Sequence, residues 1–126
     1  VVPLDAKLRF EEVASFAFGV AKVLVERDPD HLTQEFAKID RAGRIYMDTG
    51  RNGYSATIAA TYAVRAKPGA PVSAPCTWEE LAQGRAQPQT FTLRTMARRI
   101  AEVGDLWSDL PAQSLHGAIE ELRRRM

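Results

Sequence analysis

One carboxylate, Asp48, lies where it could bind a metal ion. It follows the apolar residues at 45–47 and precedes the Asn52-Gly53 pair, so the sequence places it at the end of a β-strand, just before a turn. Carboxylates in such positions ligate divalent metals, but a phosphoryl-transfer site with two ions about 4 Å apart needs several of them. A lone strand-end aspartate is more often a turn or cap residue, so both roles stay open for Asp48.

Basic residues surround Asp48 in the sequence, and a guanidinium group binds phosphate through paired hydrogen bonds. They are Arg41, Arg44, Arg51, Arg65 and Lys67. The formal net charge is only +1, so an anion site must come from this local cluster and not from a field over the whole molecule. The alternative is a solvated basic surface. The Arg123-Arg124-Arg125 run is typical of a helix C-terminus, with DNA contact as the second interpretation.

A β-hairpin is predicted to position Asp48. Its strands cover residues 44–51 and 54–63, and Asn52-Gly53 is typical of a type I′ turn, which needs positive φ at both central residues. This register puts Asp48 opposite Thr57. The side chains expected to face the core are those of Ile45, Met47, Ile58, Ala60 and Tyr62.

Helices are predicted on both sides of the hairpin. Apolar spacing favours a helix over residues 10–27, a short one over 30–38, one over 95–103 closed by Gly104, and a last one from 115 to 126. The pattern from Thr77 to Glu80 matches a capping box at the start of a short helix. The proline-rich residues 67–75 are expected to form an extended strap. The predicted fold is therefore α/β (α+β), with an antiparallel sheet centred on the hairpin, in a single domain fragment over residues 1–126.

Several kinds of site are excluded or disfavoured by composition. The single cysteine, Cys76, cannot form an internal disulfide and is expected to be packed. Neither histidine has metal-ligand spacing, no glycine-rich phosphate loop is present, and no apolar run is long enough to span a membrane. Trp78 and Trp107 are expected in the core, with base stacking as the alternative.

The stretch RIYMDTGRNGYSATIAATYAVRAKPGAPVSAPCTWEEL closely resembles the polymerase (primase-like) domain of bacterial ATP-dependent DNA ligase D. The shared pattern is a hydrophobic pair and Asp, NG, a small-residue strand, Y-S-x-R, PGAPV, and P-x-x-W-x-E-L. PLDAKLRFEEV, RDPDHLTQEF and FTLRTMARRIAEVGDLWSDL extend the resemblance over nearly the whole chain. It implies half of a primase-polymerase fold of the archaeo-eukaryotic primase superfamily.

The resemblance also implies a function and a site. Members of this family are nucleotidyltransferases that add nucleotides to DNA ends in bacterial non-homologous end joining, with Mn²⁺ or Mg²⁺ and a two-metal mechanism. Asp48 matches the third aspartate of their metal site. Arg65 matches the arginine of Y-S-x-R, which is expected to lie near the triphosphate. Arg41 matches a basic position of the family that is expected to lie near nucleotide or template. Implied partners are DNA ends, NTP or dNTP, Ku, and a ligase domain or protein, in the bacterial cytoplasm at the nucleoid.

This sequence departs from the family pattern in ways that bear on activity. The Asp-x-Asp pair and the Ser-x-His motif are absent, and VVPLD at the start matches the stretch that follows that histidine, so we expect the chain to be a piece of something longer. We therefore expect the fragment alone to be inactive and to self-associate or bind a retained N-terminal piece. The alternatives are a non-catalytic DNA- or protein-binding half-domain and an inert core.

One geometric condition follows from the same positions. If residues 57–65 formed a straight strand, Arg65 would lie roughly 26 Å from the level of Asp48. The two can serve one site only if the chain bends near Thr61.

Overall fold

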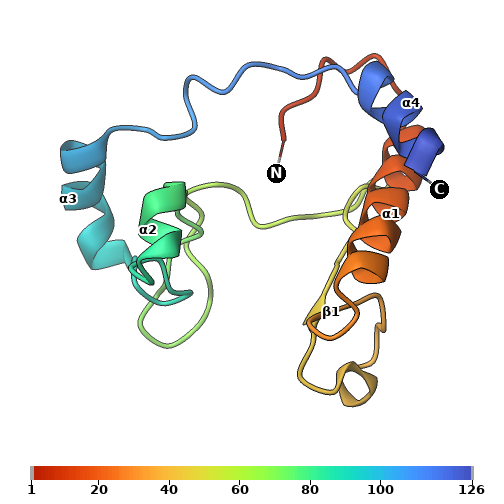
Figure 1. The fold of residues 1–126 in the computed structure, drawn as a ribbon. Helices are drawn as coiled ribbons and strands as arrows, with labels where there is room; N and C mark the ends of the chain where they lie inside the picture. The colour runs from red at the N-terminus through yellow and green to blue at the C-terminus, as the bar shows by residue number, and fades with distance from the viewer. Residues whose placement is uncertain (1, 126) are drawn as a thin grey trace. The chain divides into compact units, whose positions relative to one another are not determined.

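The computed structural model describes residues 2–125, and the chain divides into two compact units (Figure 1). The first unit contains the chain up to Thr57 together with the stretch after Pro111. The second unit is Ile58–Pro111. Each unit is described by itself below, and the assignment of the whole chain to one domain stays a prediction.

The first unit is built around α1, Phe10–Arg27, as the apolar spacing predicts. Glu12 accepts a hydrogen bond from the Arg9 backbone N–H at 2.8 Å, which satisfies one of the free donors at the helix start. The helix ends at Asp28, which precedes Pro29, because a residue before proline disfavours the helical conformation. Gly19 and Ala21 are the buried residues of α1, and the helix contacts β1.

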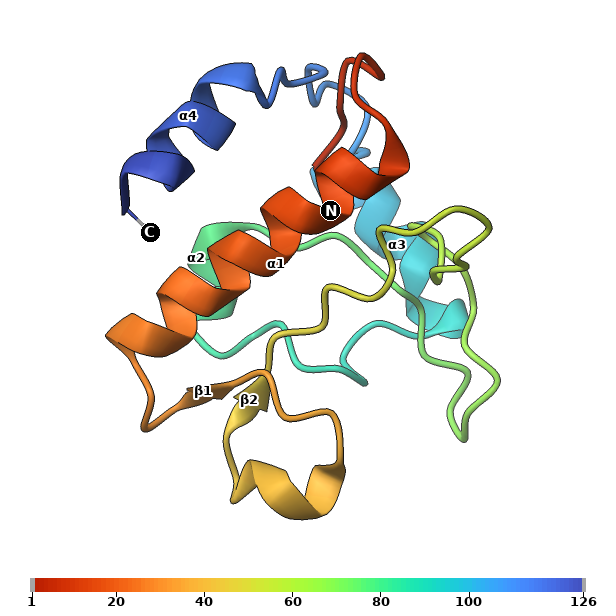
Figure 2. The same ribbon diagram turned by 90° about the vertical axis from the view of Figure 1, so that its right-hand side faces the viewer.

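Two short strands lie beside α1 in this unit. β1, Leu32–Thr33, pairs in parallel with β2, Ile45–Tyr46, and the 3-10 helix η1, Lys38–Arg41, lies in the connection between them (Figure 2). A crossover of about a dozen residues is what a parallel pair requires. The predicted helix over residues 30–38 is wrong, because β1 and the start of η1 occupy this stretch.

The helix α4, His116–Arg125, completes the first unit and contacts α1 (Figure 1). It confirms the predicted last helix, except at residue 126, which lies outside the described residues.

The predicted antiparallel hairpin is wrong. The structure has a two-stranded parallel sheet, and residues 54–60 form no strand. Gly53 does not adopt the positive φ that a type I′ turn needs, whereas Ser55 does, at 57°. A hairpin without a third strand or a covering face is marginal in water, and here the expected core residue Ile45 is 65% exposed.

The second unit contains α2, Trp78–Ala82, and α3, Leu93–Val103. The predicted capping box is confirmed: Glu80 N–H donates to the Thr77 hydroxyl at 3.1 Å, and Thr77 N–H donates to the Glu80 carboxylate at 2.9 Å. Gly104 closes α3 with φ of 73°, also as predicted. Val72 and Met96 form the small buried apolar centre.

The strap at residues 67–75 is held by isolated antiparallel bridges, Val64 to Val72 and Pro71 to Thr92. Tyr62 N–H also donates to the Ser73 carbonyl at 2.9 Å. These bonds attach the strap to both neighbouring segments without forming a regular sheet.

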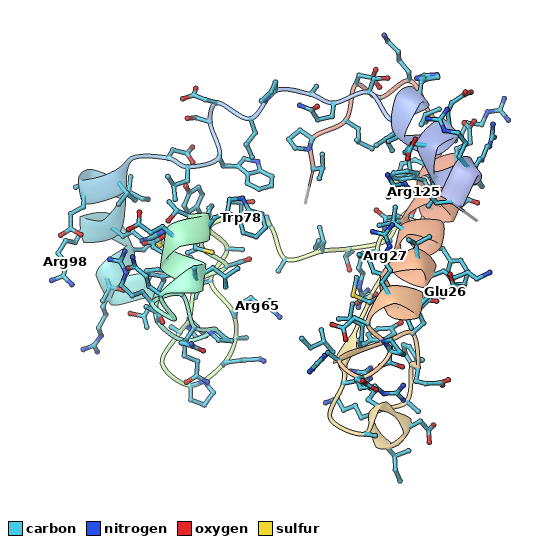
Figure 3. All side chains as sticks on the ribbon, in the orientation of Figure 1. Glu26, Arg27, Arg65, Trp78, Arg98 and Arg125 are labelled. Carbon is cyan, nitrogen blue, oxygen red and sulfur yellow. The ribbon has the colours of Figure 1, made fainter. Side chains whose placement is uncertain are left out.

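Two predictions of buried side chains fail in this unit. Trp78 is 86% exposed and projects from α2 (Figure 3), and Cys76 is exposed as well. No helix among the described residues is both long and apolar enough to cross a membrane.

Candidate nucleotide and metal site

Asp48 lies just after β2 and is exposed. Its Oδ1 accepts a hydrogen bond from the Gly50 backbone N–H at 3.0 Å, and its own N–H donates to the Tyr46 carbonyl at 3.1 Å. These bonds are those of a turn residue, which is one of the two roles that the sequence leaves open for Asp48. Within the described residues Oδ2 makes no hydrogen bond, so one oxygen is still able to take a ligand.

Asp48 cannot assemble a metal site from its surroundings in this chain. Among residues 2–125 no three His, Cys, Asp or Glu side chains gather where they could hold an ion. A pair of divalent ions needs several carboxylates. The residues that the structure describes therefore do not fit a two-metal site by themselves.

Arg41 is held firmly in the same unit, at the end of η1. Its Nε donates to the Glu35 carbonyl at 3.1 Å and its Nη2 to the Phe36 carbonyl at 2.6 Å. The guanidinium also lies 4.3 Å from the centroid of the Tyr46 ring, within the range of a cation–π contact. These bonds use two of the five N–H donors of Arg41, so the fixed guanidinium still has donors for an anion.

Arg65 lies in the second unit, on an exposed part of the chain (Figure 3). Its backbone N–H donates to the Pro71 carbonyl at 2.8 Å, which ties it to the strap. It lines a hollow of about 350 Å³ together with Ser73, Cys76, Gln87 and Phe91. An arginine at the edge of such a hollow can bind a phosphate group.

The bend expected near Thr61 is present. Residues 61–62 form a turn, the Ala63 N–H donates to the Ala60 carbonyl at 3.1 Å, and Tyr62 has a φ of 65°. The chain therefore turns within the second unit, before it reaches Arg65. The structure brings Asp48 and Arg41 into one unit and places Arg65 in the other.

An ion pair that the sequence did not reveal lies in the second unit and contacts Phe91, one of the residues that line the hollow beside Arg65. Arg99 on α3 is 8% exposed and donates from Nη1 and Nη2 to the two carboxylate oxygens of Glu80, at 2.6 and 2.8 Å. Its Nη2 also donates to the Pro75 carbonyl at 2.9 Å, and the guanidinium lies 3.9 Å from the Phe91 ring centroid. The capping-box pattern identified Glu80, but no local pattern links it to a residue in the next helix.

The protonation of this pair follows from its geometry. The hydrogen bonds from Arg99, followed by the Thr77 N–H, lower the pKa of Glu80 from 4.5 to about 2. The same Glu80 contact raises the pKa of Arg99. Both groups are therefore charged at neutral pH.

Tyr62 makes a second long-range contact in this unit. Its hydroxyl donates to Asp105 Oδ1 at 2.5 Å. Burial, and then this hydrogen bond, raise the pKa of Tyr62, while the bond lowers the pKa of Asp105. The contact joins the turn at residues 61–62 to the segment that follows α3.

Comparison with known proteins gives a consistent family. Residues 1–107 match the family described as LigD, primase-polymerase domain. The multifunctional non-homologous end joining protein LigD of Pseudomonas aeruginosa is 33% identical over 111 residues, covering 86% of this chain and 13% of that protein. The LigD protein of Mycolicibacterium smegmatis is 30% identical, over 90% of this chain and 15% of that protein. The chain thus spans a small part of the curated relatives it matches.

A solved structure shows the same fold. The polymerase domain from Mycobacterium tuberculosis ligase D, in complex with DNA, matches with a TM-score of 0.78 and 31% sequence identity. The match covers 86% of this chain and 37% of that chain. The mixed α/β architecture of this chain is therefore that of a LigD polymerase domain. From the extent of the family match and the identity to its relatives, this chain belongs to the LigD primase-polymerase domain family.

Proposed function

We propose that this chain forms part of a DNA-repair polymerase domain that transfers nucleotides to DNA ends in bacterial non-homologous end joining. The observation that carries the proposal is the family match over residues 1–107, together with the likeness to a polymerase domain that was solved with DNA. The proposed polymerase domain would act with Ku and with a ligase domain or ligase protein. It would work in the bacterial cytoplasm.

The chain's own residues have three separate roles in this proposal. Asp48 provides one carboxylate ligand to Mn²⁺ or Mg²⁺ through its free Oδ2. Arg41 presents its remaining N–H donors to nucleotide or template, and Arg65 binds the triphosphate beside the hollow in the second unit. When bound, a divalent pair would stabilise the charge that develops on the transferred phosphoryl group.

The isolated chain is expected to be inactive, because one carboxylate cannot hold two metal ions. Primer extension is the direct test, with the purified chain, Mn²⁺, a primer–template duplex, and ribo- or deoxyribonucleotides in parallel. Extension by the chain alone would disprove this part of the proposal.

The role of Asp48 is tested in a mixture that contains the rest of the domain. The probe is a polypeptide comprising the part of the Mycobacterium tuberculosis domain that this chain does not match. Asp48→Asn is expected to abolish extension in the mixture, and Arg65→Ala to raise the KM for nucleotide. Asp40→Asn is the matched control, because Asp40 is exposed on η1 in the same unit. Equal extension by Asp48→Asn and Asp40→Asn would refute the ligand role.

A non-catalytic binding half-domain is the second candidate, and it is favoured by the lack of a three-ligand cluster among the described residues. Such a module would bind DNA in a salt-dependent manner, with no change on adding nucleotide. Fluorescence anisotropy of labelled DNA, at several salt concentrations and with and without nucleotide, separates the two functions.

A further inference from the structure

Arg99 is a buried charged residue that the proposed reaction leaves without a role. Its guanidinium group donates to both carboxylate oxygens of Glu80 and to the Pro75 carbonyl. Arg99 is 8% exposed, and the Glu80 side chain is 15% exposed. Because its side chain is covered and its charge is matched by a carboxylate, Arg99 is not placed to bind an anion from solvent. A buried pair of this kind fixes the segments that it joins, since breaking it would leave one charge buried without a partner.

Three segments of the second unit meet at Arg99, which itself lies on α3. α2 is joined through Glu80, and the end of the strap is joined through the Pro75 carbonyl at 2.9 Å. The third is the segment before α3, whose Phe91 ring centroid lies 3.9 Å from the guanidinium carbon. Phe91 and residues 72–74 of the strap line the hollow of the second unit. Arg99 therefore holds one lining residue directly, and it holds the strap at the residue that follows its lining part.

Backbone hydrogen bonds connect these segments to Arg65. The strap is the middle one of three hydrogen-bonded segments. On one side, the Val72 N–H donates to the Phe91 carbonyl at 2.8 Å. On the other side, the Arg65 N–H donates to the Pro71 carbonyl at 2.8 Å. A shift of the strap relative to α3 therefore moves the backbone of Arg65 as well.

The position of the Arg65 side chain depends on its backbone. Arg65 is exposed and lines the hollow, and within the described residues its guanidinium group forms no hydrogen bond or ion pair. Its N–H donors are therefore free to bind a phosphate group. Because no other side chain holds the guanidinium group, the strap sets where these donors lie. Affinity falls when a binding group is no longer held in place beforehand, because binding must then also fix its position.

We propose that Arg99 is a positioning residue for Arg65. Through Pro75 and Phe91 it fixes the strap, and the strap holds Arg65 beside the hollow, ready for a phosphate group. Arg99 does not touch the phosphate group itself. The proposal rests on the phosphate-binding role proposed above for Arg65, and it does not depend on the metal-ligand role of Asp48.

The test titrates inorganic tripolyphosphate into the whole chain, prepared with ¹⁵N-labelled arginine. The Arg65 Nε–H resonance, assigned by its loss in Arg65→Ala, reports binding at this side chain alone and gives its Kd. Arg99→Lys keeps the positive charge, but a lysine cannot make the two parallel hydrogen bonds to Glu80. It is expected to raise the Kd about fivefold or more, because residues in one hydrogen-bonded network are energetically coupled.

A second variant and a matched control accompany Arg99→Lys. Glu80→Gln weakens the same pair from the other side and should raise the Kd in the same direction. Arg98→Lys is the control and should leave the Kd unchanged, because Arg98 projects from α3 with its side chain 76% exposed (Figure 3). Urea titration gives the stability of each variant, and the Kd is measured under conditions in which that variant is folded.

A merely structural role for Arg99 would lower stability and leave the Kd of the folded protein unchanged. That result in Arg99→Lys and Glu80→Gln would overturn the positioning role and leave the phosphate-binding role of Arg65 standing. An equal rise of the Kd in Arg98→Lys would also overturn it, because the effect would then not depend on the buried pair. If the Arg65 resonance did not respond to tripolyphosphate in the wild type, both the positioning role and the proposed role of Arg65 would be refuted.

Discussion

Removing the charge of Glu80 is expected to weaken the second unit by about 2 kcal/mol. The substitution is Glu80→Gln, which keeps the shape of the side chain and can still accept the Thr77 N–H bond of the capping box. What it removes is the carboxylate that accepts two hydrogen bonds from Arg99, at 2.6 and 2.8 Å. The variant therefore isolates the ion pair from the helix cap.

The magnitude follows from two independent considerations. A fall in the pKa of Glu80 from 4.5 to about 2 corresponds to about 3 kcal/mol of preference for the charged form in the folded state. The Glu80 side chain is 15% exposed, so solvent screens part of this, and we expect about 2 kcal/mol. A hydrogen bond to a charged group contributes about 1.5–3 kcal/mol to stability, so a loss equivalent to one such bond gives the same magnitude.

The sign of the pH dependence is also determined. Because folding lowers the pKa of Glu80, its contribution is fully present above pH 4.5 and is lost as the pH falls towards about 2. The difference in unfolding free energy between the wild type and Glu80→Gln should therefore shrink over this window. Other carboxylates titrate there too, but they cancel in the difference.

Tryptophan fluorescence is a selective assay for this unit, because both tryptophans, Trp78 and Trp107, lie within Ile58–Pro111. Urea titration followed by fluorescence gives the unfolding free energy at each pH. Glu79→Gln is the matched control, since Glu79 is the neighbouring glutamate on α2 and its side chain is 74% exposed. We expect it to change stability by less than about 0.5 kcal/mol. Equal stability of the two variants, or a constant difference down to pH 2, would refute the reasoning.

Two further predictions concern backbone strain and a tyrosine. Gly104→Ala should destabilise the second unit by about 1–3 kcal/mol, measured by the same fluorescence assay, because φ of 73° and ψ of −170° are accessible almost only to glycine. In contrast, Gly117→Ala in α4 should raise the helix signal in circular dichroism, because alanine favours a helix more than glycine does. Nothing lies within 4 Å of the new Cβ. Equal effects of Gly104→Ala and Gly117→Ala would contradict this prediction. Tyr62 should ionise above its usual pKa of 10, and stability should fall as the pH rises through that raised pKa. Ultraviolet titration checks this, and Asp105→Asn should return the pKa towards 10.

The helices could be predicted because their signals are local. The apolar spacing of α1, the Thr77–Glu80 capping box and the glycine after α3 each act within a few residues. The hairpin failed for the opposite reason. Asn52-Gly53 favours a turn, but a sheet needs neighbouring strands, and β2 instead pairs with β1 from before η1.

The residues of the candidate site could likewise be predicted only where their signals are local. Asp48 could be identified as a strand-end carboxylate, and its turn geometry could be anticipated from the residue type alone. The Arg99–Glu80 pair could not, because its two residues lie 19 positions apart in different helices. The metal-ligand and phosphate roles of Asp48, Arg65 and Arg41 stay predictions.

In the sequence, the second unit lies between the two stretches that form the first unit, and this affects the order of folding during synthesis on the ribosome. α1 ends at Arg27, but α4, which packs against it, starts only at His116. At a translation rate of about 5–20 residues per second, α1 waits on the order of five to twenty seconds for this partner. The second unit is continuous in sequence and can fold during that interval. The apolar face of α1 is meanwhile open to chaperones, so the second unit is expected to be the first to acquire stable structure in the cell.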